Sequence, residues 1–354
     1  MSYFRDNIEK MKGYEPGYQP KSLEVIKLNT NENPYPPSPS VIEVIRNVEA
    51  ENLRRYPDPT ANIFREEAAK INGVEADWIM CCNGGDELLK MAFSAFCDRR
   101  RPVTYPVPTY SLYPVLANIQ NCRAVEVPFD KEFNLPARLS RVKAALTIVC
   151  NPNAPSGTLV AAEELAELAG EIKGVLLIDE AYVDFAERNC VGLVRQFANV
   201  IILRSLSKGY SLAGLRFGYA IARPEMIQGL LKVKDSYNAD AISIAAATAA
   251  IKDQQYFRET VNKVKAERKR LTEQLRGLGF EMPESSSNFV FVEHPSTSSG
   301  QARRAKEIYD KLVQQNIYVR YWDLAGIENK LRISVGTKEQ NDKLLAALKE
   351  IVAG

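Results

Sequence analysis

The sequence predicts an α/β protein in which a large domain built on a mostly parallel sheet is joined to a smaller α+β domain. Between residues 78 and 222, short apolar runs alternate with helical runs, the pattern of parallel strands joined by crossover helices. From residue 253 onward, helices alternate with only a few strands, and 354 residues are enough for about two domains. We therefore expect a large domain over residues 41–252 and a small domain over residues 253–354.

The first forty residues are expected to form an N-terminal arm that also contributes to the small domain. Residues 29–40 hold four prolines and three asparagines, which disfavours a helix there. Ser40 can cap a helix over residues 41–52, and a second helix over residues 61–72 ends at Gly73.

The large domain continues with interleaved strands and helices, and after residue 223 it becomes helical. Helical patterns cover residues 84–97, 112–120 and 161–172. Apolar runs predict strands within residues 78–83, 101–114 (a strand and a turn), 122–129, 144–152, 174–182, 199–208 and 215–222.

The small domain begins with a long amphipathic helix over residues 253–277, closed by Gly277 and Gly279. The serine-rich segment 294–302 is expected to be a mobile loop. The remaining elements are strands over residues 288–293, 317–322 and 331–336 and helices over residues 302–316 and 338–352.

The composition argues against several classes of function. The 46 basic and 44 acidic residues give a net charge of only +2, whereas nucleic-acid-binding domains are usually strongly basic. The same balance gives no reason to expect a membrane surface as a partner. Catalytic triads and many zinc sites use histidine, and the chain has one, His294, which we expect in an exposed loop. We therefore expect no metal site, and acid–base chemistry from Lys, Tyr, Asp, Glu or a cofactor.

The six cysteines and the apolar runs indicate the compartment. No C-x-x-C pair occurs, no apolar run reaches the roughly 18 residues of a membrane span, and the N-terminus is too polar for a signal peptide. We expect reduced cysteines in a cytoplasmic protein.

A lysine in a serine-containing loop is the first candidate for catalysis. Lys208 follows a strand, with Ser205 and Ser207 beside it and Arg216 eight residues later. Serine hydroxyls and a guanidinium can bind a phosphate together, and a neighbouring lysine can form a Schiff base with an aldehyde. This combination suits pyridoxal 5′-phosphate, although an ordinary surface loop can carry the same residues.

Asp179 and Tyr182, at the end of a second strand and just after it, suit the same cofactor. Asp179 ends the run VLLID, where parallel strands present side chains to a ligand crevice. A buried carboxylate there needs a cationic partner, which a protonated pyridine nitrogen would supply. Tyr182 could donate to the phenolic oxygen of the cofactor. The alternative is an ordinary acidic turn at the end of a strand.

Three further turns lie at the same edge of the expected sheet. In residues 83–87, NGGDE, glycines and a helix N-terminus favour an anion. In residues 108–113, PTYSLY, aromatic rings could stack on a planar ligand. The turn NPNAPSG follows another strand at residues 151–157.

In this order the motifs resemble the fold-type I pyridoxal-phosphate aminotransferases. They read NENPY, YPDP, GGDE, PTYSLY, NPNAPSG, DEAY, SLSK, LAGLRFGY and LRISVGT, and the resemblance covers about residues 10–350. It implies a seven-stranded, mostly parallel sheet in the large domain. Within this superfamily the sequence is most similar to the histidinol-phosphate aminotransferases.

The resemblance implies cofactor roles for matching positions. Lys208 would bind the cofactor as a Schiff base and carry protons, and Asp179 would pair with the pyridinium nitrogen. Tyr182 would hydrogen-bond the phenolic oxygen, and Tyr110 would stack on the ring. The phosphate would be held by Ser205, Ser207, Arg216 and the turn of Gly84, Gly85 and Asp86.

The resemblance also implies a substrate site and a homodimer. Arg320 and Arg332 would hold the anionic end of the substrate, and Tyr14 and Asn33 of the arm would close over it. Tyr56 would reach the active site of the partner subunit.

One position departs from the family pattern. Its turn usually reads NPNNPTG, and the asparagine before PTG contacts the phenolic oxygen of the cofactor. Ala154 occupies that position here, and Asn153 beside it could substitute with a backbone shift. We expect an altered cofactor pKa rather than lost catalysis, because Tyr182 still donates.

The function that the resemblance implies is transamination between L-histidinol phosphate and 2-oxoglutarate, by a ping-pong mechanism that needs no histidine side chain. An aromatic amino-acid aminotransferase and a threonine-phosphate decarboxylase share the cofactor motifs and remain alternatives. A non-catalytic binding protein is disfavoured by the intact Lys208, Asp179, Tyr182 and Arg216. A nucleotide-binding dehydrogenase is disfavoured because GGDE is not G-x-G-x-x-G.

Overall fold

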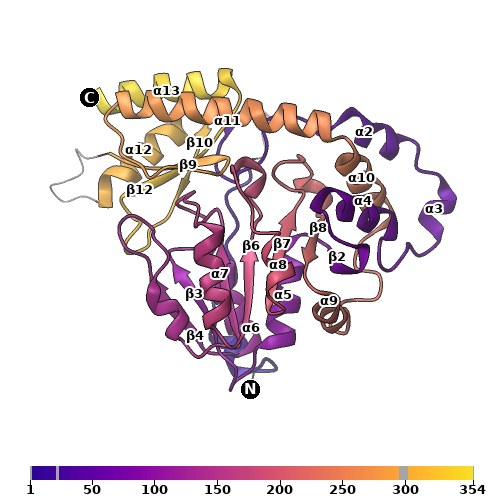
Figure 1. The fold of residues 1–354 in the computed structure, drawn as a ribbon. Coiled ribbons are helices and arrows are strands. Elements are labelled where there is room, and N and C mark those ends of the chain that lie inside the picture. Colours follow the sequence, from indigo (N-terminus) through magenta and orange to yellow (C-terminus); the bar gives the residue numbers. More distant parts are fainter. Residues whose placement is uncertain (1, 21–23, 295–301, 354) are drawn as a thin grey trace.

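A seven-stranded sheet forms the centre of the computed structural model, which describes residues 2–20, 24–294 and 302–353 (Figure 1). Its strand order is β2-β8-β7-β6-β5-β3-β4. β8 is antiparallel to both neighbours and the other pairs are parallel, so the predicted mostly parallel sheet is confirmed. The strands are β2 (Ile79–Cys82), β3 (Val103–Val107), β4 (Ala124–Pro128), β5 (Leu146–Cys150), β6 (Val175–Asp179), β7 (Val200–Ser205) and β8 (Gly218–Ile221).

Helices cover both faces of this sheet. Successive side chains of a strand point to opposite faces, and the central strands are apolar in both directions: Val149 packs into one core and Ile148 into the other. The first core includes residues of α4 (Asn62–Asn72), α7 (Ala162–Glu171), α8 (Leu193–Gln196) and α10 (Ala241–Lys252). The second includes residues of α5 (Gly85–Phe96), α6 (Leu112–Gln120) and α9 (Pro224–Leu231). With both faces covered, the ends of the strands remain available for a ligand.

A smaller sheet and three helices lie beside the carboxyl ends of the parallel strands (Figure 1). Three antiparallel strands have the order β11-β12-β9, and β1 of the N-terminal arm pairs with β10. The predicted division of the chain at residues 40 and 252 stays a prediction. The elements are β1 (Ile26–Lys27), β9 (Phe289–Glu293), β10 (Ile317–Tyr318), β11 (Arg320–Tyr321), β12 (Lys330–Ser334), α11 (Gln254–Gly277), α12 (Ala302–Gln314) and α13 (Lys338–Ala353).

Two predicted elements are each divided in the structure. The helix expected over residues 41–52 is α2 (Pro39–Arg46), capped by Ser38, followed by α3 (Ala50–Arg54). The helix starts earlier because Pro39 occupies its first turn, where a missing N–H costs nothing. The strand expected over residues 317–322 is β10 and β11, because the two halves pair with different strands.

The remaining short elements connect these layers. They are α1 (Asp6–Lys10), η1 (Ala76–Trp78), η2 (Ala137–Arg141), η3 (Val183–Phe185) and η4 (Ala213–Leu215). All six cysteines are free. Among the helices described, none combines the length and the apolar character that a membrane crossing requires. Most of the predicted serine-rich loop, residues 295–301, lies outside the described residues.

Candidate active site

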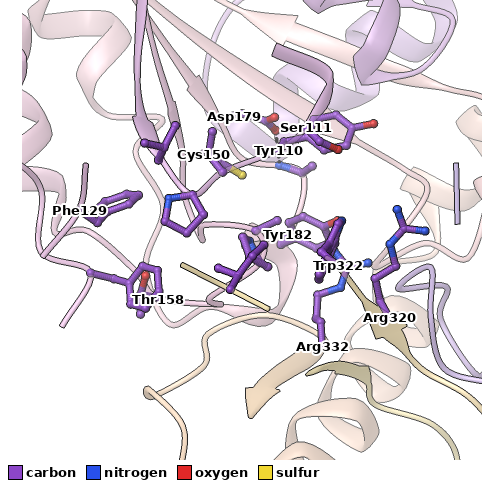
Figure 2. A pocket seen from close by; sticks show the side chains of 18 of the residues that line it. Tyr110, Ser111, Phe129, Cys150, Thr158, Asp179, Tyr182, Arg320, Trp322 and Arg332 are labelled. Carbon is purple, nitrogen blue, oxygen red and sulfur yellow. Dashed lines mark hydrogen bonds between the residues drawn. The ribbon is translucent and has the colours of Figure 1, made fainter. Parts of the chain in front are cut away.

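A cavity of about 1910 Å³ opens at the carboxyl ends of the parallel strands and reaches the small sheet (Figure 2). Pockets for one small molecule commonly measure about 300–1000 Å³, so this cavity is larger than one small ligand needs. Most of the predicted site residues line it, although they come from distant parts of the chain. They are Tyr14, Gly85, Asp86, Tyr110, Asp179, Tyr182, Ser205, Ser207, Lys208, Arg216, Arg320 and Arg332.

Asp179, the last residue of β6, is 4% exposed and both of its carboxylate oxygens accept hydrogen bonds. One accepts from the Tyr113 hydroxyl at 2.7 Å and the other from the Ala181 amide at 3.1 Å. Burial raises the Asp179 pKa to about 6, while the bond from Tyr113 acts in the opposite direction. Both donors are neutral, so the charge of an ionised Asp179 is left uncompensated by them.

Lys208 lies one turn beyond the end of β7. Its Nζ donates to the Thr30 carbonyl at 3.3 Å and lies 5.6 Å from the centre of the Tyr182 ring. Burial, assisted by the positive charge of Arg332, lowers the Lys208 pKa to about 8. At neutral pH the neutral amine is therefore more populated than it is for an exposed lysine.

Tyr182 is oriented by the N-terminal arm. Its hydroxyl accepts a hydrogen bond from the Asn31 side chain at 3.1 Å, and its ring meets Phe289 edge-on. Burial raises the Tyr182 pKa to about 12, so the hydroxyl keeps its proton and can donate it to a ligand oxygen.

A turn before α5 and the loop after η4 form a cradle for an anion. The Arg216 guanidinium lies against Gly84, where a Cβ would fall only 2.7 Å from one of its nitrogens, and Gly84 has a φ of +78°. Arg216 also contacts Asp86 at 3.2 Å and Ser207 at 3.5 Å. The first amides of α5 have no acceptor within the helix, so they are available to the same anion.

Arg320 and Arg332 face each other as direct cross-strand partners on β11 and β12. Like charges placed opposite each other destabilise a sheet unless an anion joins them. Neither has a carboxylate within ion-pair distance in the part of the chain that the structure describes, and the buried Nε of Arg332 has no acceptor there. The Trp322 ring lies 5.1 Å from each guanidinium carbon (Figure 2).

Two tyrosines border the cavity between these groups. The Tyr110 hydroxyl donates to Asp86 at 3.2 Å, and burial raises the Tyr110 pKa. Tyr14 of the N-terminal arm meets the Tyr110 ring edge-on at 6.0 Å.

Four predicted residues do not line the cavity. Gly84 makes room for Arg216, as described above. The Asn33 side chain donates to the carbonyls of Lys208 and Gly209, so it fixes the lysine loop instead of covering the cavity. The Asn153 amide is used within its own turn, where it contacts Pro108, Thr109 and Ser156. Tyr56 is 80% exposed and stacks on Tyr237.

His294 also lies outside the cavity lining. Our expectation of an exposed histidine is wrong, because the residue is only partly exposed. Its ring lies 4.9 Å from Phe280 and its Nε2 is 3.2 Å from the Leu278 carbonyl oxygen. Among the described residues, no group of three or more His, Cys, Asp and Glu side chains is arranged to hold a metal.

Sequence reasoning missed Tyr113 and Trp322. Tyr113 belongs to the PTYSLY motif, but only the tertiary structure brings its hydroxyl, in α6, to Asp179 at the end of β6. Trp322 lies two residues after Arg320, on the same side of an extended segment, and this spacing could have identified it.

Comparison with known proteins gives one consistent result. Residues 24–348 match the family model "Aminotransferase class I and II". Histidinol-phosphate aminotransferase 1 of Trichormus variabilis is 47% identical over 353 residues, which cover 99% of each chain. Histidinol-phosphate aminotransferase of Citrifermentans bemidjiense is 43% identical over 355 residues, the whole of both chains.

A solved structure is also similar over the full length. The histidinol-phosphate aminotransferase of Sinorhizobium meliloti, in complex with pyridoxal 5′-phosphate, has a TM-score of 0.89 and is 27% identical, with 100% of this chain and 98% of that chain covered.

Proposed function

This chain belongs to the class I and II aminotransferase family, and on that premise we propose that it transfers an amino group between L-histidinol phosphate and 2-oxoglutarate. The products are imidazole acetol phosphate and glutamate, in histidine biosynthesis, and the cofactor is pyridoxal 5′-phosphate. The observation that carries this proposal is a cavity with Lys208 and Asp179 on one wall and Arg320 and Arg332 on the other.

The wall that carries Lys208 and Asp179, called here the large-domain wall after the predicted domain, has residues that fit this cofactor. Asp179 is a buried carboxylate held only by neutral donors, and a protonated ring nitrogen would supply the missing positive charge. The space at Gly84 that a Cβ would fill brings Arg216 next to the first amides of α5, as a phosphate requires. Ser205 and Ser207 line the cavity on the same side. When bound, the cofactor supplies an electron-accepting ring that stabilises negative charge on the substrate Cα.

The protein contributes proton transfer and orientation. Lys208 would hold the cofactor through its Nζ, and the same Nζ, when free, would take the proton from the substrate Cα. A lysine with a lowered pKa suits both tasks, because it can be neutral near pH 8. Tyr182, with its raised pKa, remains a donor to the phenolic oxygen. Ala154 lines the cavity where the family usually has asparagine, which leaves Tyr182 as the donor at this position.

The opposite wall, which carries Arg320 and Arg332 and is called here the small-domain wall, selects the substrate. A phosphate group brought between Arg320 and Arg332 relieves the repulsion of these cross-strand partners and gives the orphaned Nε of Arg332 an acceptor. Tyr14 and Tyr110 border the intervening space, where the imidazole ring of the substrate can pack.

The test is turnover of competing substrates by the purified, cofactor-loaded protein. Histidinol phosphate, phenylalanine and threonine phosphate are compared side by side, and we expect the highest kcat/KM for histidinol phosphate. Complementation of a histidine auxotroph that lacks this step gives an independent readout. Preference for phenylalanine, or decarboxylation of threonine phosphate, would replace the proposed substrate without changing the family.

We further propose that the enzyme is a cytoplasmic homodimer in which Tyr56 completes the site of the partner subunit. A tyrosine that is 80% exposed and stacked on the exposed Tyr237 suits an interface residue. The six free cysteines accord with a reducing compartment.

Subunit mixing tests the dimer. Lys208→Ala and Tyr56→Ala proteins are each impaired, but a mixed dimer has one site with an intact Lys208 and an intact Tyr56. Random mixing should restore about a quarter of the wild-type activity, as expected for a two-fold dimer. Unchanged activity after mixing would mean that Tyr56 acts within its own chain.

A further inference from the structure

Tyr113 is a completely buried tyrosine that does not line the cavity and yet touches a residue that does. Its side chain is 0% exposed, and its hydroxyl donates to Oδ2 of Asp179 at 2.7 Å. Removing only that hydroxyl would leave an ionised, buried carboxylate short of one donor, which costs more than a neutral hydrogen bond contributes.

The position of Tyr113 is fixed by its packing. It is in the first turn of α6, its amide donates to the Tyr110 carbonyl, and its ring packs against the rings of Tyr105 and Tyr110 at 5.5 and 5.7 Å. This packing holds the hydroxyl beside Oδ2 of Asp179. Ala181 binds the other oxygen through its amide, so both carboxylate oxygens are oriented.

From this geometry we propose that Tyr113 is a positioning residue for the amino-transfer reaction, which aims the Asp179 carboxylate into the cavity and favours its ionised form. The proposal rests on the proposed function, because Asp179 matters to catalysis only as the partner of a ring nitrogen. It concerns a contact within the protein and can be tested without the cofactor as well.

The groups that surround Asp179 leave this role to Tyr113. Its neighbours include two acids, which oppose its ionisation, and a cysteine and two tyrosines that are neutral at pH 7. They are Asp86, Glu180, Cys150, Tyr113 and Tyr182. The Cys150 thiol donates to the Pro152 carbonyl, and the Tyr182 hydroxyl lies against Asn31. Of these five side chains, Tyr113 is the one with a hydrogen bond to the carboxylate.

The chain provides a matched control in Tyr105. It is also 0% exposed, belongs to the same core, and donates its hydroxyl to a carboxylate, that of Glu126 at 3.3 Å. Tyr105 and Glu126 both line the cavity, but Glu126 is on the exposed side of β4, where water can replace the lost donor. Tyr113→Phe and Tyr105→Phe thus each remove a hydroxyl group from the same core. Only Tyr113→Phe removes a hydrogen-bond donor from Asp179.

The first experiment uses the cofactor-free protein and compares melting temperatures at pH 5 and pH 8. The folded pKa of Asp179 is raised, so the stability that its protonated form contributes is present below the unfolded value near 4 and is lost as pH rises through about 6. Without the Tyr113 donor the ionised form becomes still less favourable. Relative to the wild type, Tyr113→Phe should therefore lower the melting temperature more at pH 8 than at pH 5. Tyr105→Phe should lower it by the same amount at both pH values.

The second experiment uses the loaded enzyme. Tyr113→Phe should weaken pyridoxal-phosphate binding and lower kcat by about tenfold each, the expected loss of one hydrogen bond to a charged group. KM for histidinol phosphate should change less than twofold, because the substrate anion is bound on the other wall. Tyr105→Phe should resemble the wild type in all three quantities.

An Asp179→Asn background separates the possible outcomes. There, adding Tyr113→Phe should have no pH-dependent effect on the melting temperature. Equal losses for the two tyrosine variants at both pH values, or an unchanged effect in the Asp179→Asn background, would reduce Tyr113 to a packing residue and overturn the proposal. Failure of the wild type to bind the cofactor would instead contradict the proposed function, and the pH experiment on the cofactor-free protein would still decide the role of Tyr113.

Discussion

The two walls of the cavity differ in how far their polar groups are satisfied by the protein itself. On the large-domain wall, Asp179 has two donors, and Arg216 already contacts Asp86 and Ser207. On the small-domain wall, Arg320 and Arg332 have aromatic rings and backbone carbonyls for neighbours, and no carboxylate partner among the residues described.

This difference matches the two ligands that we propose for the two walls. A cofactor that stays bound through every turnover benefits from a rigid site whose groups are oriented in advance. A substrate has to leave after each turnover. Arginines without a carboxylate partner in the protein can bind its anionic group and then release it. The large-domain wall should therefore control the chemistry and the small-domain wall the affinity for the substrate, and variants of each wall test this division.

The largest effect is expected for Lys208→Ala, because it removes both the covalent attachment and the proton carrier. Activity should fall by at least about 10⁴-fold, the upper range for loss of general acid–base catalysis alone. The visible absorption band of the bound cofactor should also be lost. Retention of that band would exclude Lys208 as the point of attachment.

The next largest effect is expected for Arg332→Ala, which removes the more deeply buried cation of the small-domain wall. Loss of a charge-assisted contact with the substrate phosphate should lower kcat/KM for histidinol phosphate by about 100-fold, mainly through KM. Arg332→Lys keeps the charge but not the planar donor pair, and should recover only part of this loss. The visible band of the cofactor should be unchanged in both variants, and a weakened band would show that the two walls are not independent.

A smaller effect is expected from pH acting on the large-domain wall. Attachment of added pyridoxal phosphate requires the neutral amine of Lys208. Because the Lys208 pKa is lowered to about 8, this neutral form predominates above pH 8. The attachment rate should rise by about tenfold between pH 7 and pH 9 and then level off, as a single deprotonation predicts. Stopped-flow absorbance measures this rate, and a midpoint near 10.5 would mean that burial does not perturb the lysine.

The smallest effect is expected for Trp322→Leu on the small-domain wall. The indole lies 5.1 Å from both guanidinium carbons, and cation–π contacts of this kind contribute about 0.5–2 kcal/mol. Loss of this support should raise KM for histidinol phosphate by about fivefold and leave kcat unchanged. Trp78, the other tryptophan, lies outside the cavity lining, so Trp78→Phe is the control. A fall in kcat for Trp322→Leu would assign the residue to the chemistry instead.

Much of the fold could be predicted because its signals are local. Each central strand is an apolar run of five or six residues, and each helix has its own periodicity. The errors occurred where a signal was not local. Residues 317–322 were predicted as one strand, but β10 pairs with β1 and β11 pairs with β12, in different sheets. A segment of six residues does not indicate which strand it will pair with.

The site shows the same division. Lys208, Asp179 and Arg216 could be proposed from the sequence because each lies at the end of a strand or in a loop between elements, in a motif of recognisable composition. The motif order supplied their expected roles. Asn33 was assigned to the substrate, whereas its side chain binds the carbonyls of Lys208 and Gly209. The sequence places Asn33 in the arm but does not state which surface the arm packs against.

By itself, then, the sequence determined the alternation of strands and helices and the residue types that pyridoxal-phosphate chemistry needs, because both are recorded in short segments of the chain. The tertiary structure decided which of these groups meet. It brought the Tyr113 hydroxyl to Asp179, Arg332 opposite Arg320, and Asn31 to Tyr182. These contacts depend on how α6, β11, β12 and the N-terminal arm pack, and the free energy of packing is shared among many residues that are far apart in the sequence.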